Sequence, residues 1–347
     1  MRVCYATREA VMAATDQAVP PRLTARVDAA IAAAADTVDK EMRRPAGFYP
    51  TVATRYLDWP PAQPSRSHVL WLDELDLLAV TALTAGGTTV APGDYLLRPD
   101  GRPPFNRVEI NLAGGAAFAA GDTTQRAIAI TGTWGYCDTT AAAGALTEGL
   151  DAVETEVDVT DSAAVGVGDL VLIDTERMLV TGKRMVATGQ TLLAPLTAQV
   201  DAQTVSVTDG AAFAVGEVLL VDAERLLVDD IAGNTLVVKR AHGGTRLAVH
   251  TGSAIWAPRT LVVERGVLGT TAATHSAAAA VRRHQPPGPI AALNLALAVC
   301  ELQQQSAGYA RTAGSGDNQR ETAGRGLAQA WKAAAGYKRR GRGPWTV

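Results

Sequence analysis

The sequence carries one β-rich segment twice, as VDVTDSAAVGVGDLVLIDTERMLV at residues 157–180 and as VSVTDGAAFAVGEVLLVDAERLLV at residues 205–228. Fourteen of the 24 aligned positions are identical, far more than chance pairing of two β segments would give. Each copy predicts a strand, a glycine-containing connection, a second strand, a turn over Asp-x-Glu-Arg and a returning strand. The chain therefore contains an internal duplication that builds a compact all-β module.

A shorter repeat follows these segments. LVVKRAHGGTRLAVHTGSAIW from residue 236 aligns with LVVERGVLGTTAATHSAAAAV from residue 261, and both contain Leu-Val-Val, an Arg, a Gly-Thr pair and a His five residues past that Thr. Gly233 and Asn234 supply a tight turn just before the first of them. This second repeat indicates that another structural unit has been copied.

The flanks of the duplication mix helical and extended patterns. Apolar residues recur at helical spacing over 22–42 and from Ile290 to Gln305, and two more helices are predicted near Thr7 and over 320–335. Runs in which apolar and polar residues alternate predict a small antiparallel sheet. They lie at 69–73, 77–97 with a turn at Gly86 and Gly87, 106–110 and 127–136. Residues 47–64 predict an extended, packed connection, and residues 139–146 an Ala/Gly-rich link.

The net charge of −3 conceals an uneven distribution. Residues 147–230 hold sixteen Asp/Glu against four Lys/Arg, whereas residues 311–347 hold eight Lys/Arg against two Asp/Glu. A basic tail suits either nucleic-acid phosphates or an acidic protein surface. Without a nucleic-acid-binding domain we favour a protein partner. No long apolar run and no signal peptide is present, so we expect neither membrane insertion nor secretion, and three scattered cysteines predict buried, reduced thiols.

The Asp-x-Glu pairs, Asp174 with Glu176 and Asp222 with Glu224, have the spacing of two carboxylates that face the same way on a strand. Paired carboxylates can hydrolyse glycosides. Both copies keep the pair beside an Arg, however, and charged residues at a hairpin commonly stabilise the turn and solvate an edge. We therefore interpret these residues as structural, and we expect no enzyme and no cofactor.

Four histidines gather in one third of the chain: His242, His250, His275 and His284. Their spacings of 8, 25 and 9 match no metal-ligand motif, so we expect no metal site. His250 and His275 are equivalent in the short repeat, which predicts a side chain that closes a loop onto the Gly-Thr turn. The Gly-rich stretch at residue 113 lacks the pattern of a phosphate-binding loop.

Several stretches outside the duplication have a common character: FYPTVATRYLDWPPAQ at 48–63, LWLDELDLLAVTALTAGGTTVAPGDYLLRPDGRPPFNRVEI at 70–110, and a strand ending in TGTWGY at residue 136. Together with the early helix pair they resemble the head-to-tail adaptor (head-completion or connector) proteins of long-tailed bacteriophages. In that family such a strand is followed after a few residues by a Pro and a helix with small apolar residues. Here PPGPIAALNLALAVCELQQQ has that character, but it comes about 150 residues later.

Removing residues 147–285 would rejoin TGTWGYCD to that helix, so the duplicated module looks like an insertion whose ends lie close together. We therefore predict an α+β fold: a small helical adaptor core with a β-hairpin region, and an inserted all-β domain built by duplication. Its parts are the N-terminal core at 1–146, the insertion at 147–285, a core helix at 286–310, and a basic C-terminal helix and tail at 311–347.

The resemblance implies a structural virion protein of the neck, assembled in the host cytoplasm. It would form a homo-oligomeric ring, usually of twelve subunits, between the portal protein and a tail-side neck or stopper protein. Genomic DNA would pass through the ring without sequence-specific binding. Charge and position nominate the portal contacts, which are Arg320, Arg325, Trp331, Lys332, Lys338, Arg339, Arg340, Arg342 and Trp345. The alternative is a virion surface protein that binds or cleaves carbohydrate with the duplicated module, which would require exposed aromatic residues there.

Overall fold

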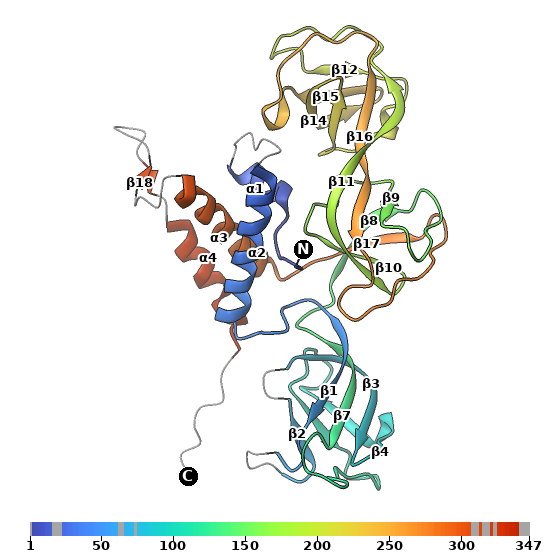
Figure 1. The fold of residues 1–347 in the computed structure, drawn as a ribbon, viewed down its shortest axis with the longest axis vertical. Coiled ribbons are helices and arrows are strands. Elements are labelled where there is room, and N and C mark those ends of the chain that lie inside the picture. Colours follow the sequence, from blue (N-terminus) through green and yellow to red (C-terminus); the bar gives the residue numbers. More distant parts are fainter. Residues whose placement is uncertain are drawn as a thin grey trace.

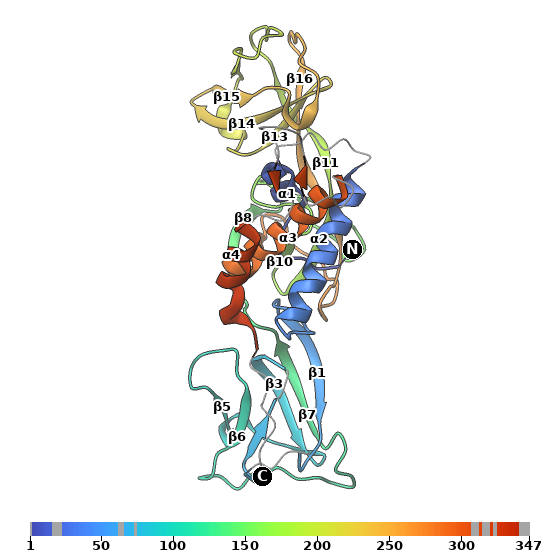
Figure 2. The ribbon, with the colours of Figure 1, turned by 90° about the vertical axis from the view of Figure 1, so that its left-hand side faces the viewer.

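The computed structural model describes residues 2–15, 23–61, 66–72, 75–306, 312–313, 320–321 and 325–339. It is a β-rich α+β fold, because 36% of the chain is strand and 22% is helix, and its sheets are antiparallel. The molecule is elongated, with a β lobe at each end and a middle level where helices lie beside a third β region (Figures 1 and 2). No described helix is long and apolar enough to cross a bilayer.

The helices come from both ends of the chain and pack together. They are α1 (Arg8–Thr15), α2 (Thr24–Glu41), α3 (Gly288–Ser306) and α4 (Arg325–Ala334). Ile31 of α2 and Leu293 of α3 are fully buried in one apolar cluster. Buried Asn294 ties the segments together, because its Oδ1 accepts from Tyr5 N at 2.8 Å and its Nδ2 donates to the carbonyl of Ile31 at 3.2 Å.

The last predicted helix begins later than expected. Arg320–Glu321 forms the short strand β19, which pairs with β18 (Thr312–Ala313), and α4 starts only at Arg325. The Gly-rich sequence before Arg325 disfavours an earlier helical start, because glycine loses the most backbone entropy in a helix.

The lower lobe consists of two small sheets around one core. Strands β1 (Thr51–Leu57), β7 (Ile128–Trp134), β3 (Leu77–Ala85) and β4 (Thr88–Thr89) form the first sheet, and β2 (Val69–Trp71), β6 (Arg107–Ile110) and β5 (Tyr95–Arg98) form the second. The segment expected as an extended connection contains β1, which pairs along its length with β7. Trp134 and Leu83 are buried between the sheets.

A ten-stranded sheet contains both copies of the duplication. Its strands, in spatial order, are β12 (Thr204–Ser206), β15 (Thr235–Lys239), β14 (Glu224–Ala232), β13 (Val218–Val221), β16 (Ala254–Glu264), β11 (Glu176–Thr191), β10 (Leu170–Ile173), β17 (Ala280–His284) and β8 (Thr140–Ala145), and β9 (Glu156–Asp158) pairs with β16. The predicted link at 139–146 is therefore mostly a strand, because β8 pairs with β17.

The two copies are nested. The β14–β15 hairpin of the second copy turns at Gly233 and Asn234, whereas the equivalent β11–β16 hairpin of the first copy has the whole second copy in place of its turn. We call residues 140–185 with 258–284 module 1 and residues 186–257 module 2. Each module has its own apolar core. The long repeat and the short repeat are thus the first and last parts of one repeating unit. In module 1 these two parts are separated along the chain by module 2.

The ends of module 1 meet beside the helices. The amide of Gln285 donates to the carbonyl of Thr139 at 2.8 Å, so the chain enters and leaves this β region at one place. The two ends of this β region are therefore close together, but the entry lies before the predicted residue 147, because residues 140–145 already form β8 of the same sheet.

Candidate functional site

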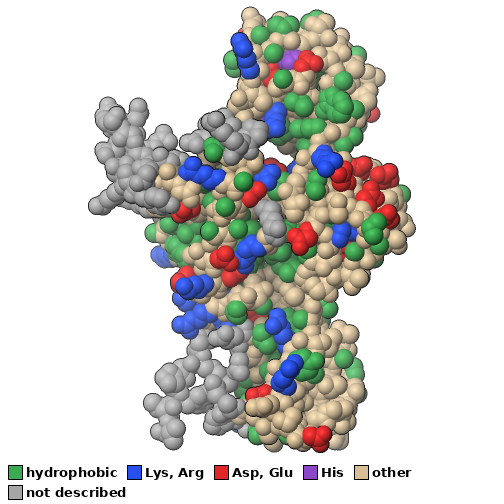
Figure 3. All heavy atoms as spheres, in the orientation of Figure 1, with side chains coloured by type: hydrophobic (Ala, Val, Ile, Leu, Met, Phe, Trp, Pro, Cys, Tyr) green, Lys and Arg blue, Asp and Glu red, His purple; other side chains and the backbone are tan. Residues whose placement is uncertain are grey.

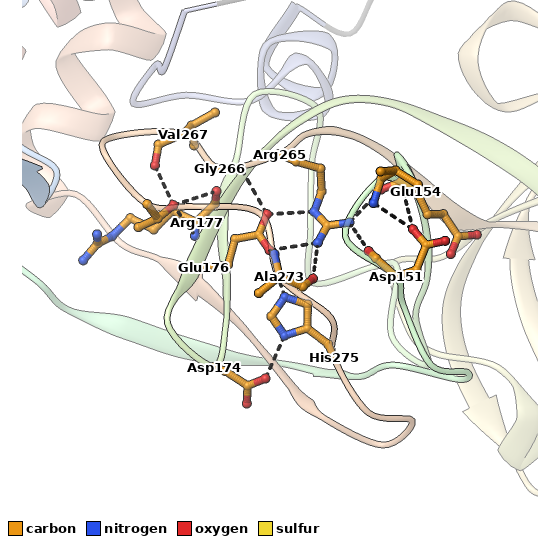
Figure 4. Close-up of polar contacts among 12 residues, drawn as sticks. Asp151, Glu154, Asp174, Glu176, Arg177, Arg265, Gly266, Val267, Ala273 and His275 are labelled. Atoms are coloured by element: carbon orange, nitrogen blue, oxygen red, sulfur yellow. Dashed lines mark hydrogen bonds and ion pairs between the residues drawn. The ribbon is translucent and has the colours of Figure 1, made fainter.

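The Asp-x-Glu pair of module 1 lies at the turn between β10 and β11 (Figure 4). Asp174 occupies the left-handed region with φ +50°, which lets the chain reverse within two residues. His275 lies between the two carboxylates, with Nδ1 2.7 Å from Asp174 Oδ2 and Nε2 2.9 Å from Glu176 Oε2. The imidazole therefore bridges the exposed Asp and the buried Glu.

Arg265 holds the other side of Glu176. Its Nε lies 2.7 Å from Oε1 and its Nη2 2.8 Å from Oε2, which is a bidentate pair. The backbone amides of Gly266 and Ala273 donate to the same carboxylate at 3.0 and 2.9 Å. Burial disfavours the charged form of Glu176, but the bonds from Arg265, His275 and these amides outweigh it and lower its pKa to about 2.

Module 2 repeats this cluster. His250 lies 2.7 Å from Asp222 and 2.9 Å from Glu224, and Arg240 pairs with Glu224 at 2.7 and 2.8 Å. The amides of Ala241 and Ala248 occupy the places of the two amides in module 1, at 2.9 and 3.0 Å. Burial again opposes ionisation, and the bonds from Arg240 and His250 again lower the pKa of Glu224 to about 2.

This geometry supports a structural role for both clusters. Each oxygen of Glu176 and of Glu224 already accepts at least two hydrogen bonds, and both side chains are at most 1% exposed. A general acid or nucleophile needs an oxygen that can reach substrate, and these oxygens have no such freedom. The clusters fasten a loop of about ten residues to the β-turn in each module.

Two details of the sequence-based interpretation are wrong. The Glu of each pair does not solvate a sheet edge, because it is buried, and only Asp174 and Asp222 are exposed. The histidines do not close onto the Gly-Thr turn, because their partners are carboxylates. The threonine of that turn has its own role: the hydroxyl of Thr270 accepts from the amide of Arg177 at 3.1 Å, and Thr245 does the same for Arg225 at 3.0 Å.

Sequence reasoning missed Arg240 and Arg265 as partners of the glutamates. The signal was present, since both are the Arg shared by the short repeat, four residues past its leading Leu. The distance along the chain concealed it, because 89 residues separate Glu176 from Arg265 and only 16 separate Glu224 from Arg240.

The remaining histidines and cysteines form no cluster with ligand geometry. Among the described residues, no group of three His, Cys, Asp or Glu side chains is placed to hold a metal ion. His284 is buried at the end of β17, 3.5 Å from Asp138, and neither ring nitrogen has a hydrogen-bond partner in the described chain. Cys4 and Cys137 form no disulfide, and of the three cysteines Cys4 is fully buried whereas Cys137 and Cys300 are half-buried.

The two modules contain two aromatic residues, Phe213 and Trp256. Phe213 is 7% exposed within the core of module 2, and Trp256 is 41% exposed on β16. A single exposed ring is less stacking surface than a sugar-binding face normally uses. At the level of module 1, acidic side chains gather on the side away from the helices (Figure 3).

The nominated basic residues are in different surroundings. Lys332 and Lys338 are exposed, and Lys338 lies 3.8 Å from Glu41. Trp331 packs against the helical core. Arg320 belongs to β19 and Arg325 begins α4, whereas Arg340, Arg342 and Trp345 lie outside the described residues.

Arg339 is bound within the chain. Its Nη2 donates to the carbonyl of Leu75 at 2.9 Å, and its Nη1 lies 3.3 Å from Asp76, which also pairs with Arg44. The guanidinium of Arg44 lies over the ring of Tyr136, 4.4 Å from its centroid. This network fastens the segment that follows α4 to the lower lobe.

Comparison with protein-family models, with curated proteins and with solved structures finds no match for this chain.

Proposed function

We propose that this chain is a structural virion protein that forms a ring, of about twelve subunits, between the portal and the tail of a long-tailed phage. The helices at the two ends of the chain would build the ring, and its tail side would receive a neck or stopper protein. Genomic DNA would pass through the channel without sequence-specific contacts. This places the protein in the virion neck, and it requires no catalytic group and no cofactor.

One observation carries the proposal. The helices before and after the β modules pack into a single bundle with a common core. The chain enters the modules from the lower lobe at Thr139 and leaves them towards α3 at Gln285, and these two residues share a hydrogen bond. Such an arrangement is expected of a small helical adaptor that has received a β insertion. The saturated Glu176 and Glu224 clusters favour an assembly role over hydrolysis.

Two of the nominated portal contacts are suited to a direct test, because their side chains are exposed and make no essential contact inside the described chain. Lys332 and Lys338 are exposed. Trp331 packs against the helical core. Arg339 is bound to Leu75 and Asp76, so deleting the tail from residue 338 would also remove contacts within the fold. Charge reversal is therefore the cleaner test.

Electron microscopy of the purified chain, with and without the portal protein of the same phage, tests the proposal. Rings alone or on the portal are expected, and a chain that stays monomeric with the portal present would refute it. The K332E/K338E variant should lose portal binding, whereas R246E, on an exposed site in module 2, should retain it. Equal binding by both variants would remove these lysines from the interface.

The alternative is a carbohydrate-binding role for the modules, which rests on exposed Trp256. A glycan-binding and hydrolysis assay on the full chain would decide it. Binding that W256A abolishes would favour the alternative, and no binding would reject it.

A further inference from the structure

The two modules present the same sheet face to different surroundings. In module 1, Val167, Leu170 and Leu179 are at most 2% exposed, because this face lies against the helical core that contains Leu170. The positions equivalent to the first and second in module 2 are Val215, which is 57% exposed, and Val218, which is half-buried. One copy of the face is therefore covered and the other is open.

The open face is apolar and continuous across three strands. Leu220 of β13 pairs with Trp256 of β16, and Val218 pairs with Leu227 of β14. We call these four residues, together with Val215, the docking face. Leu220 and Leu227 are half-buried and Trp256 is 41% exposed, so the face presents large apolar side chains to solvent.

Module 1 shows what such a face binds. The amide of Arg8, the first residue of α1, donates to the carbonyl of Val167 at 3.0 Å, and the amide of Val167 donates to the carboxylate of Glu9 at 2.8 Å. The start of a helix is thus held by one residue, through an acidic side chain in its first turn. Val215 has the same two backbone groups, and neither makes a hydrogen bond within the described chain.

We propose that the docking face of module 2 binds the N-terminal turn of a helix from a partner protein, with an acidic side chain in that turn accepting from the amide of Val215. The apolar residues of the partner helix would cover Val218, Leu220, Leu227 and Trp256. This inference is independent of the connector role, because it follows from the equivalence of the two modules.

The structure also argues against the chain's own α1 as the occupant. A Cβ at Gly166 would lie 2.6 Å from Thr7 Cβ and 2.7 Å from Glu9 Oε2. Module 2 has Ala214 at the equivalent position. A second copy of α1 therefore clashes there, and the partner must have glycine where this chain has Thr7. Lys183, 3.7 Å from Glu9, is replaced by Ile231, so the partner's acid relies on the amide of Val215.

A fluorescent peptide with the sequence of residues 2–15 and the change T7G is a suitable probe for the full-length chain. Fluorescence anisotropy should detect saturable binding. Changing Glu9 of the peptide to Gln should weaken binding about tenfold, since a charged acceptor becomes a neutral one. The chain variant V215D should lose binding, whereas V153D, at an 83% exposed valine in module 1, should not. The unmodified peptide should bind only the A214G chain.

Three outcomes would overturn the proposal. The first is no binding of the T7G peptide at millimolar concentration, and the second is binding that neither the Glu9→Gln peptide nor V215D alters. The third is self-association of the wild-type chain that V215D abolishes in light scattering while the peptide does not bind, which would assign the face to a second copy. Ring formation or its absence affects none of these readouts, so the proposal and the connector role fail separately.

Discussion

Glu176 and Arg265 form a bidentate ion pair although 89 residues separate them, and the same pair in module 2, Glu224 with Arg240, spans only 16 residues. The N–O distances of the two pairs are equal because module 2 replaces only the turn of the module 1 hairpin and leaves its two strands paired. The pair therefore closes the same local structure twice, once across a short loop and once across an entire inserted module.

Replacing Arg240 by Leu should destabilise the chain strongly. Glu224 is fully buried, and removing its partner leaves an unpaired buried charge, which typically costs about 3–5 kcal/mol. Urea unfolding followed by circular dichroism measures the loss. The control is R246A, an exposed Arg in the same loop, which should change stability little. A similar effect of both substitutions would contradict the assigned role.

Acidification should weaken the fold through the two glutamates. Their pKa is about 2 in the folded chain, below the ordinary 4.5, so the unfolded chain binds protons more strongly. The stability they contribute is complete above pH 4.5 and is lost as the pH falls from there through about 2. The E176Q/E224Q variant should be less stable at pH 7 and should lose less on acidification. Urea midpoints of wild type and variant between pH 7 and pH 3 test this. If the two midpoints fall in parallel as the pH is lowered, the prediction is refuted.

His284 should add a separate pH dependence at milder acidity. Burial lowers its pKa from 6.5 to about 4, with Asp138 opposing and Arg177 adding to the shift. The unfolded chain again binds the proton more strongly, so stability falls as the pH drops from 6.5 towards 4. Burial raises the pKa of Asp169 to about 6, which acts in the opposite direction. The effect is therefore measured as the difference in free energy of unfolding between wild type and H284L. A difference that stays constant from pH 7 to pH 4.5 would contradict the prediction.

Module 2 should be removable as a unit. Replacing residues 187–256 by Asn-Gly would join Val186 to Ala257, which are paired neighbours on β11 and β16. Module 1 keeps its own core, so the shortened chain should unfold cooperatively with an unchanged helical content. Circular dichroism and thermal unfolding test this. Loss of cooperative unfolding would indicate that module 1 depends on contacts with module 2, such as the one between Ser162 and Glu217.

Asp76 should determine how firmly the segment after α4 is held. It pairs with both Arg44 and Arg339, and burial together with Arg339 lowers the pKa of Arg44 to about 10. D76N would leave two cations close together without an anion, and hydrogen exchange in residues 325–339 should become faster. D100N removes an exposed carboxylate paired with Arg98 and should leave this exchange unchanged. Equal protection in D76N and wild type would argue against the network.

Local sequence was sufficient to predict the strands of both copies, the Gly233–Asn234 turn and the helices before and after them. These features depend on local periodicity and turn chemistry, so they can be predicted without knowledge of distant partners. The repeated Asp-x-Glu pair also revealed a building block, although it did not reveal that the Glu is buried.

Long-range packing determines two further features, which are the insertion of one module into the hairpin of the other and the contacts of Arg265 and His275 with Glu176. A sequence shows neither burial nor which distant segments come into contact. In module 1 the contacting segments are also far apart along the chain, because module 2 lies between them. For the same reason the contrast between covered Val167 and open Val215 was hidden, because these identical residues lie in equivalent turns before β10 and β13 and differ in what the rest of the chain packs against them.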